Sequence, residues 1–366
     1  MDIIIIGTGA SAMLLAQSLI QRKCFRSLRI IGPARGVHTI RFSYWSGSES
    51  TPFDRFTDAS WSNLIAFGAT GSQIDIPLSR FEYRSLDAQA WISELHRDVR
   101  AARGVDWIET MAEEIAPSSD GVTVYTPLGQ FEADWVFSSG GTPAASPTCW
   151  QRFEGWNVNV VEPMDQESAT LMDFRTPAEG DFRFIYALPL GPHQLFIEHV
   201  SYQPCDHAAH IRTHLDTVLA PNGWECLETE RGATPAFRTP PPRRDGRHVR
   251  IGVAGGLAKT ATGYALLRMW RDAEGIAEGL SSREQPRLTK PIGGLHKVAD
   301  HFFLHLLQHA PHRLPGLMES LFAGTSGDSV LAFLDDRATI REQIDVALST
   351  PGWFQWLVGA GSRRRA

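Results

Sequence analysis

The feature that most constrains this chain is a glycine turn directly behind a short β-branched run. Ile3–Ile6 is typical of a parallel strand buried on both faces. The next residues, Gly7-Thr8-Gly9-Ala10-Ser11-Ala12, match the G-x-G-x-x-G/A pattern, in which a pyrophosphate approaches the N-terminus of a helix. A buried helix over 12–20 and a strand over 28–31 complete a βαβ unit. We therefore expect Gly7, Gly9 and Ala12 to bind a dinucleotide; a purely structural turn is the alternative.

One part of the usual dinucleotide site is absent from the sequence. The second strand should end in an acidic residue that binds the ribose hydroxyls. Here Ile31 is followed by Gly32-Pro33. Ribose contacts must therefore come from elsewhere, or the affinity for the dinucleotide is lower.

The remaining pattern predicts an α/β fold with two domains and a helical end. A strand over 135–141 and a return at 249–256 belong with the nucleotide-binding half, whereas alternating strands over 156–160, 182–188 and 194–200 indicate an antiparallel sheet. Apolar stripes near Phe302 and Leu317 predict C-terminal helices. We expect a Rossmann-like domain over 1–80, 104–150 and 245–290, a β-rich substrate domain over 81–103 and 151–244, and a helical segment over 291–366.

Composition excludes several classes of protein. The net charge of −6 and the pI near 6.1 argue against a nucleic-acid partner, which requires a basic face. Four widely spaced cysteines without a C-x-x-C pair, and a start without a leader pattern, predict reduced thiols in a cytoplasm. No stretch approaches the ~20 apolar residues of a membrane span, so membrane contact is expected to be peripheral at most.

Several segments, in order, resemble the lycopene cyclase family of flavoproteins over nearly the whole chain. The segments that are similar to the family's motifs are Arg41-Phe42-Ser43-Tyr44-Trp45, Tyr83-Arg84-Ser85, Gly155-Trp156 with Ala169–Arg175, Phe184–Leu190 with Leu195–Glu198, Gly252–Tyr264, and Phe333-Leu334-Asp335. The departures are His199, where a second acidic residue is frequent, Thr260 in place of a proline, and Gly32. They suggest a divergent member and leave open a substrate other than lycopene.

The resemblance implies a redox-neutral cyclisation of a long isoprenoid, a lycopene-like carotenoid or another polyprenyl chain, with reduced FAD. A terminal alkene is protonated, a second alkene attacks the cation, and a proton leaves. Protonating an alkene needs an acid whose pKa a dry pocket raises, and Glu198 is the candidate; a solvent-facing position on its strand is the alternative. His199 should point to the opposite face and be structural, unless a bulge intervenes.

The same resemblance assigns roles to further residues. Asp173 and Arg175 are expected to support Glu198 rather than react; an ion pair that holds the sheet is the alternative. Aromatic faces stabilise cations, so we expect the pocket walls to include Tyr44, Trp45 and Tyr186. For each of them, an ordinary position in the hydrophobic core is the alternative. The second flavin-contacting loop would supply Gly255, Gly256, Thr262 and Gly263.

Two other functions remain open at this stage, and a metal site is not expected. A flavin monooxygenase acting on a small aromatic would share the fold but consume oxygen and a nicotinamide cofactor. A polyprenyl carrier without flavin would be a binding protein rather than an enzyme. His301 and His305 have helical i, i+4 spacing but no third ligand, which favours a solvated or capping pair.

Overall fold

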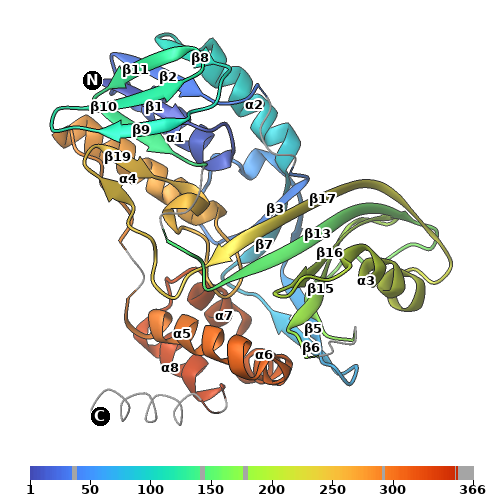
Figure 1. The fold of residues 1–366 in the computed structure, drawn as a ribbon. Coiled ribbons are helices and arrows are strands. Elements are labelled where there is room, and N and C mark those ends of the chain that lie inside the picture. The colour runs from blue at the N-terminus through green and yellow to red at the C-terminus, as the bar shows by residue number, and fades with distance from the viewer. Residues whose placement is uncertain (35–38, 141–144, 176–179, 291–292, 351, 353–366) are drawn as a thin grey trace, which may run out of the picture. The chain divides into compact units, whose positions relative to one another are not determined.

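The computed structural model describes residues 1–34, 39–140, 145–175, 180–290, 293–350 and 352. The chain folds into two compact units, each assembled from separate stretches (Figure 1). Unit 1 consists of Met1–Phe42, Asp87–Thr148 and Pro235–Pro291, and unit 2 consists of Ser43–Leu86, Cys149–Thr234 and Ile292–Ala366.

Unit 1 is built on a six-stranded sheet in the order β18-β19-β12-β1-β2-β8. All its neighbouring strands pair in parallel except β18, which is antiparallel to β19. The central strand contains Ile3, Ile4 and Ile5, all buried, as the continuous β-branched run predicts. The strands are β1 (Asp2–Ile6), β2 (Ser27–Ile31), β8 (Val105–Ile108), β12 (Trp135–Ser138), β18 (Arg244–Asp245) and β19 (His248–Arg250).

Helices and a small antiparallel sheet cover the sheet of unit 1. Helix α1 (Ala10–Arg22) packs against α2 (Ala88–Ala101) and α4 (Leu266–Arg283). The small sheet consists of β9 (Glu114–Pro117), β10 (Val122–Thr126) and β11 (Gly129–Ala133). Its Val122 and Val124 share a core with Ile4 and Val136. A 3₁₀ turn, η3 (Gly252–Gly255), follows β19.

Unit 2 contains a seven-stranded sheet in the order β17-β13-β16-β15-β14-β5-β6. Helix α3 (His207–His214) packs on one face of this sheet through Ala208 and Ile211, which join a core with Ile185 and Ile197. The strands are β5 (Asn63–Phe67), β6 (Gln73–Pro77), β13 (Cys149–Val160), β14 (Ala169–Asp173), β15 (Arg183–Gly191), β16 (Gln194–Ser201) and β17 (Trp224–Ala236). A π-helical turn, η2 (Leu215–Leu219), extends α3.

A second small sheet and the C-terminal helices complete unit 2. The sheet has the order β3-β7-β4 and consists of β3 (Arg41–Ser46), β4 (Thr57–Trp61) and β7 (Glu82–Asp87). The helices are α5 (Gly294–His309), α6 (Leu314–Gly324), α7 (Gly327–Leu334) and α8 (Ile340–Leu348), with short turns η1 (Asp54–Phe56) and η4 (Pro311–Arg313). Along the described residues, no helix combines the length and the apolar character needed to cross a membrane.

The units divide the chain differently from the expected domains in four places. Residues 43–80 belong to unit 2, because β4 pairs with β7 and β5 pairs with β14. Residues 87–103, expected in the substrate domain, belong to unit 1, because their helix α2 packs on α1. Residues 235–244, also expected in the substrate domain, belong to unit 1 as well. The described C-terminal helices are part of unit 2 rather than a separate segment, and 353–366 lie outside the described residues.

Candidate functional site

The turn between β1 and α1 has the backbone that the glycine pattern predicts. Gly7 has a φ of +107° and donates its N–H to the Ile31 carbonyl oxygen at 2.8 Å. A Cβ at Gly7 would lie 2.1 Å from Ser139 Oγ, so no side chain fits there. Gly9 is the N-cap of α1, and apart from its chain neighbours no atom of the described residues lies within 4 Å of its Cβ position. With Ala12 buried in the first turns of α1, the helix N-terminus is left open to an anionic group.

Gly32 explains why the ribose-binding acid is missing. A Cβ there would lie 2.9 Å from Thr8 Cγ2 and 3.4 Å from the Gly7 backbone. A side chain at this position would therefore collide with the turn between β1 and α1. The close packing of this turn against the residue that follows β2 leaves no room for the acid.

The second expected cofactor segment lies against the first. Gly252 has a φ of +61°, and a Cβ there would lie 2.3 Å from Ser11 Oγ in the first turn of α1. After η3, which contains Gly255 and ends at Gly256, a tight turn brings the Gly263 N–H to the Lys259 carbonyl oxygen at 2.8 Å. The structure thus brings these two segments, far apart in sequence, together.

Thr262 provides the test of whether this region suits a cofactor. Its Oγ1 is buried and has no hydrogen-bond partner within the described part of the chain. A buried hydroxyl without a partner costs roughly 1–3 kcal/mol, so it marks a position where an additional polar group would be favourable. Together with the open N-terminus of α1, it fits a dinucleotide bound along this edge of unit 1.

In unit 2, Glu198 lies on the face of the large sheet opposite α3. Residues paired across antiparallel strands share a face. Glu198 pairs with Tyr186 of β15 and Gly155 of β13, whereas its neighbour His199 pairs with Ile185, which packs towards α3. The register is regular here, without a bulge. The expected opposite orientation of His199 is therefore confirmed.

The environment of Glu198 favours the protonated carboxyl. The side chain is half-buried. Burial, followed by the nearby Glu230 carboxylate, raises the pKa of Glu198 well above its usual range. Both causes act in the same direction, so this group holds its proton at higher pH than an ordinary glutamate.

Gly155 allows the two glutamates to approach each other. It lies opposite Glu198 on β13, and its Cβ position is 3.2 Å from Glu230 Oε1 and 2.6 Å from the Phe196 ring. Any side chain at Gly155 would occupy the space that Glu230 and Phe196 use. Glu230, on β17, is 6% exposed and therefore buried despite lying in a strand rich in glutamate.

Aromatic side chains surround the same face. The hydroxyl of Tyr186 lies 2.8 Å from Tyr83 Oη and 2.6 Å from Ser43 Oγ. The Tyr83 ring stacks on the Trp45 ring, with 6.2 Å between the ring centroids, and its centroid lies 6.4 Å from that of the Trp61 ring. Two of the expected wall residues, Tyr186 and Trp45, are thus joined through Tyr83. They form a buried aromatic cluster beside the acid.

Tyr44 does not belong to this cluster. Its hydroxyl donates to Asp54 Oδ1 at 2.7 Å and lies 2.8 Å from Thr57 Oγ1, and its ring packs on Phe53. Successive residues of a strand point to opposite faces, so Tyr44 and Trp45 diverge. The expectation that Tyr44 lines the same wall as Tyr186 is wrong for this reason.

Asp173 and Arg175 also lie away from Glu198. Arg175 Nε donates to both oxygens of Asp173 at 3.0 Å, and His214 Nε2 of α3 lies 3.1 Å from Asp173 Oδ2. Asp173 pairs with Ile185, which places it on the α3 face. The expected support of Glu198 is therefore wrong, and the alternative, a structural ion pair, agrees with the structure: this pair joins β14 to α3.

Sequence reasoning missed Glu230, Tyr83 and Ser43 as members of the site. Tyr83 and Ser43 lie within segments that were already singled out for their similarity to the family. For Glu230 no such signal exists, because Glu225, Glu228 and Glu230 look alike along the strand and only the packing of β17 on β13 distinguishes them.

Together, these features define a two-unit α/β protein with a dinucleotide-binding fold and a separate sheet that holds a half-buried acid beside aromatic rings. The sequence matches the family described as "Lycopene cyclase protein" over residues 2–355. The chain therefore belongs to the lycopene cyclase family of enzymes, as the motifs predicted.

Individual relatives agree with this assignment. The chain is 28% identical to an uncharacterized carotenoid cyclase of Deinococcus radiodurans, over 77% of this chain and 70% of that protein. It is 27% identical to a lycopene beta-cyclase of Pseudescherichia vulneris, over 82% of this chain and 80% of that protein. It is 26% identical to a lycopene beta cyclase of Synechococcus elongatus, over 77% and 73% respectively.

Solved structures show the same fold at low sequence identity. A geranylgeranyl bacteriochlorophyll reductase-like protein from Thermoplasma acidophilum matches with a TM-score of 0.63 and 11% identity, covering 98% of both chains. Klebsiella pneumoniae HpxO, solved with FAD and uric acid, matches with a TM-score of 0.59 and 14% identity, covering 96% of this chain and 97% of that one. The expected fold class is thereby confirmed.

Proposed function

We propose that this protein is an FAD-dependent cyclase that closes a ring at the end of a lycopene-like carotenoid without net oxidation or reduction. The observation that carries the proposal is Glu198, whose pKa is raised by burial and by Glu230. An acid whose pKa is raised, beside Tyr186 and its aromatic neighbours, is what protonation of an alkene requires.

In the proposed reaction, Glu198 donates its proton to one carbon of the terminal double bond. The electron pair of a neighbouring double bond then attacks the resulting cationic carbon and forms the ring. The carboxylate left at Glu198, beside Glu230, is a strong base in this environment and takes back the proton that the ring carbon loses. Substrate and product are therefore isomers, and the acid is restored.

The aromatic cluster has a defined role in this scheme. Tyr186, Tyr83 and Trp45 present π faces that attract a cation through their quadrupoles, worth about 0.5–2 kcal/mol for each well-placed ring. The hydrogen bond between the Tyr186 and Tyr83 hydroxyls fixes the two rings relative to each other. These side chains also keep water away from the reacting carbons.

The residues proposed to hold FAD are those of the two adjoining segments of unit 1. Gly7, Gly9 and Ala12 would admit the pyrophosphate at the N-terminus of α1, and Thr262 Oγ1 would gain the partner it lacks. Gly255, Gly256 and Gly263 would let the second segment approach closely. Reduced FAD, when bound, supplies negative charge that stabilises a cationic transition state.

We also propose that the enzyme meets its apolar substrate at a lipid surface. Ile340, Ile344 and Leu348 are spaced at i, i+4 and i+8 on α8 and are 76%, 48% and 69% exposed. Replacing all three with serine should weaken sedimentation with lipid vesicles. The same change at the exposed Val161 and Leu227 should leave it unaltered.

The test of the main proposal is an anaerobic incubation of the protein with lycopene and FAD reduced by dithionite. We expect a cyclised product of unchanged mass in H₂O, one deuterium incorporated per ring when the reaction runs in D₂O, and no oxygen consumption. Oxygen and nicotinamide consumption with a hydroxylated small aromatic would instead identify a monooxygenase. A purified protein that binds polyprenyl chains but no flavin would identify a carrier.

A further inference from the structure

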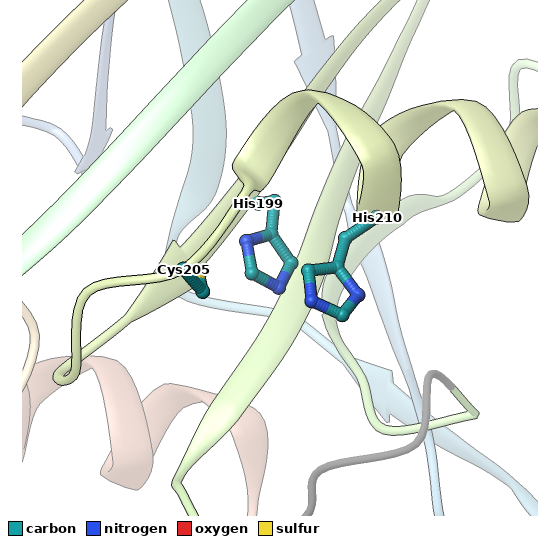
Figure 2. Close-up of side chains that lie close together, drawn as sticks. All are labelled: His199, Cys205 and His210. Carbon is teal, nitrogen blue, oxygen red and sulfur yellow. The ribbon is translucent and has the colours of Figure 1, made fainter.

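A cluster of nitrogen and sulfur ligands lies where β16 meets α3, on the face of the sheet away from Glu198. It comprises His199 on β16, Cys205 in the following turn and His210 on α3. One potential ligand atom from each residue lies within 4.8 Å of the others. Figure 2 shows the His199 and His210 rings side by side, with Cys205 beside them.

His199 is the strongest indication that this cluster binds something. The side chain is 0% exposed, and its Nε2 has no hydrogen-bond partner within the described residues. Its other nitrogen, Nδ1, lies 2.8 Å from His207 Nδ1. His207 Nδ1 also lies 3.1 Å from the His199 carbonyl oxygen, to which it can only donate. Metal binding requires the other arrangement, in which His199 Nδ1 carries the ring proton and donates it to His207 Nδ1, so that the lone pair of His199 Nε2 is free and His207 gives up its contact with the carbonyl oxygen. A partner that orients a metal-binding histidine in this way is usual.

The side chains of the cluster are of the types that zinc binds, two imidazoles and one thiol that can ionise. Neutral imidazole and thiolate are the ligands that zinc prefers.

Arg183 already binds one of the proposed ligands, His210, and a metal ion would have to displace it. Its Nη1 donates to His210 Nε2 at 2.9 Å. Arg183 Nε and Asp181 Oδ2 lie 3.8 Å apart, and neither has a hydrogen-bond partner among the described residues. Released from His210, the guanidinium could complete its pairing with Asp181. Metal binding would therefore exchange one contact of Arg183 for another.

We propose that His199, Cys205 and His210 bind a Zn²⁺ ion that fastens α3 to β16. Ligands of tetrahedral zinc lie roughly 3.3–3.8 Å apart, from bond lengths of ~2.0–2.3 Å, so small rotations of these side chains complete the geometry. Water would take the fourth position. The site is independent of the cyclisation chemistry and restrains the strand that also holds Glu198.

The test is a titration of the metal-free full-length protein with Co²⁺, which gives a charge-transfer absorption when a thiolate binds it. We expect one equivalent to bind, with this absorption, and Zn²⁺ to displace it. Cys205→Ser should abolish the absorption and weaken binding at least tenfold. Cys226→Ser, which alters an exposed cysteine, should change neither.

A second pair of variants keeps the test decisive if Cys205→Ser does not fold. His210→Gln should weaken Co²⁺ binding at least tenfold, while the exposed His312→Gln should not. The proposal is overturned if the metal-free protein binds no Co²⁺ at micromolar concentration. It is also overturned if binding is the same in the site variants and in their controls.

Discussion

Two acidic residues on opposite faces of the same sheet have opposite pKa shifts. Glu198 faces away from α3, and burial followed by Glu230 raises its pKa well above the usual range. Asp173 faces α3; burial alone would raise its pKa, but His214 and Arg175 outweigh burial and lower it to about 2. Burial is common to both sites. The sign of each shift is therefore set by the neighbouring charges.

This difference separates an acid from a structural ion pair. Asp173 is ionised at every physiological pH and fully occupied by Arg175, so it has no proton to give. Glu198 keeps a proton in an apolar setting, at a cost to stability. The face of the sheet that carries this destabilising acid is therefore a better candidate for chemistry than the face whose charges are paired.

The largest expected effect is on the activity of Glu198→Gln. Removing a positioned general acid costs about 10²–10⁴-fold in rate, so kcat should fall by that factor while the flavin spectrum remains. The measurement is product formation under anaerobic conditions. Glu225→Gln, which alters an exposed glutamate of β17, is the control and should keep full activity. Unchanged turnover in Glu198→Gln would remove Glu198 from the acid role.

On the other face, Asp173→Asn should affect stability first. It leaves Arg175 and His214 without their carboxylate, and breaking a buried ion pair costs about 3–5 kcal/mol. Because the pKa of Asp173 is lowered in the fold, its contribution is present above the unfolded pKa of about 3.9 and lost as the pH falls towards 2. Urea unfolding should show this loss, with Glu167→Gln, an exposed carboxyl, as the control. A loss of turnover at full stability would contradict the structural role.

Some features of the two acidic sites could be predicted from the sequence alone, and others could not. The glycine turn, the parallel strands and the alternation around Glu198 depend on local pattern, and the structure has them where expected. The face of Asp173 could not be predicted, because the pairing of β14 shifts register between Thr170 and Asp173. The alternation of side chains between the two faces of a strand does not predict the face of a residue beyond such a register shift.

Glu230 could not be predicted for a different reason. Its effect on Glu198 depends on the order β17-β13-β16 and on the missing side chain of Gly155 between them. Strand order in an antiparallel sheet is a property of the whole fold, and no local pattern encodes it. The same limit applies to Tyr83, which lies on another sheet yet shares a hydrogen bond with Tyr186.

A smaller effect is expected from Glu230→Gln, which removes a negative charge beside Glu198. The pKa of Glu198 should then fall, so the loss of activity at alkaline pH should begin at a lower pH. The measurement is the pH profile of kcat. An unchanged alkaline limb would show that burial alone sets the pKa of Glu198, whereas Glu225→Gln should leave the profile as it is.

Glu198→Gln should also change stability in the direction opposite to Asp173→Asn. A glutamate whose pKa is raised in the fold stays protonated there, while the unfolded chain ionises above a pKa of about 4.3. Stability therefore falls as the pH rises from that value to the folded pKa. The Gln variant lacks this penalty, so near neutral pH it should unfold at a higher urea concentration than the parent. A lower midpoint would contradict the raised pKa.

The smallest expected effect tests whether the aromatic cluster belongs to the reacting face. Tyr83→Phe removes the hydrogen bond to Tyr186, worth about 0.5–1.5 kcal/mol, and should lower kcat roughly 2–10-fold because the ring beside Glu198 is less firmly placed. Tyr44→Phe removes a hydrogen bond of similar strength to Asp54 on the other side of β3. Its cost should appear in urea unfolding and not in kcat. If the two variants lowered kcat equally, the two sides of β3 would not differ in their effect on the reaction, and the assignment of only one side to the reacting face would be wrong.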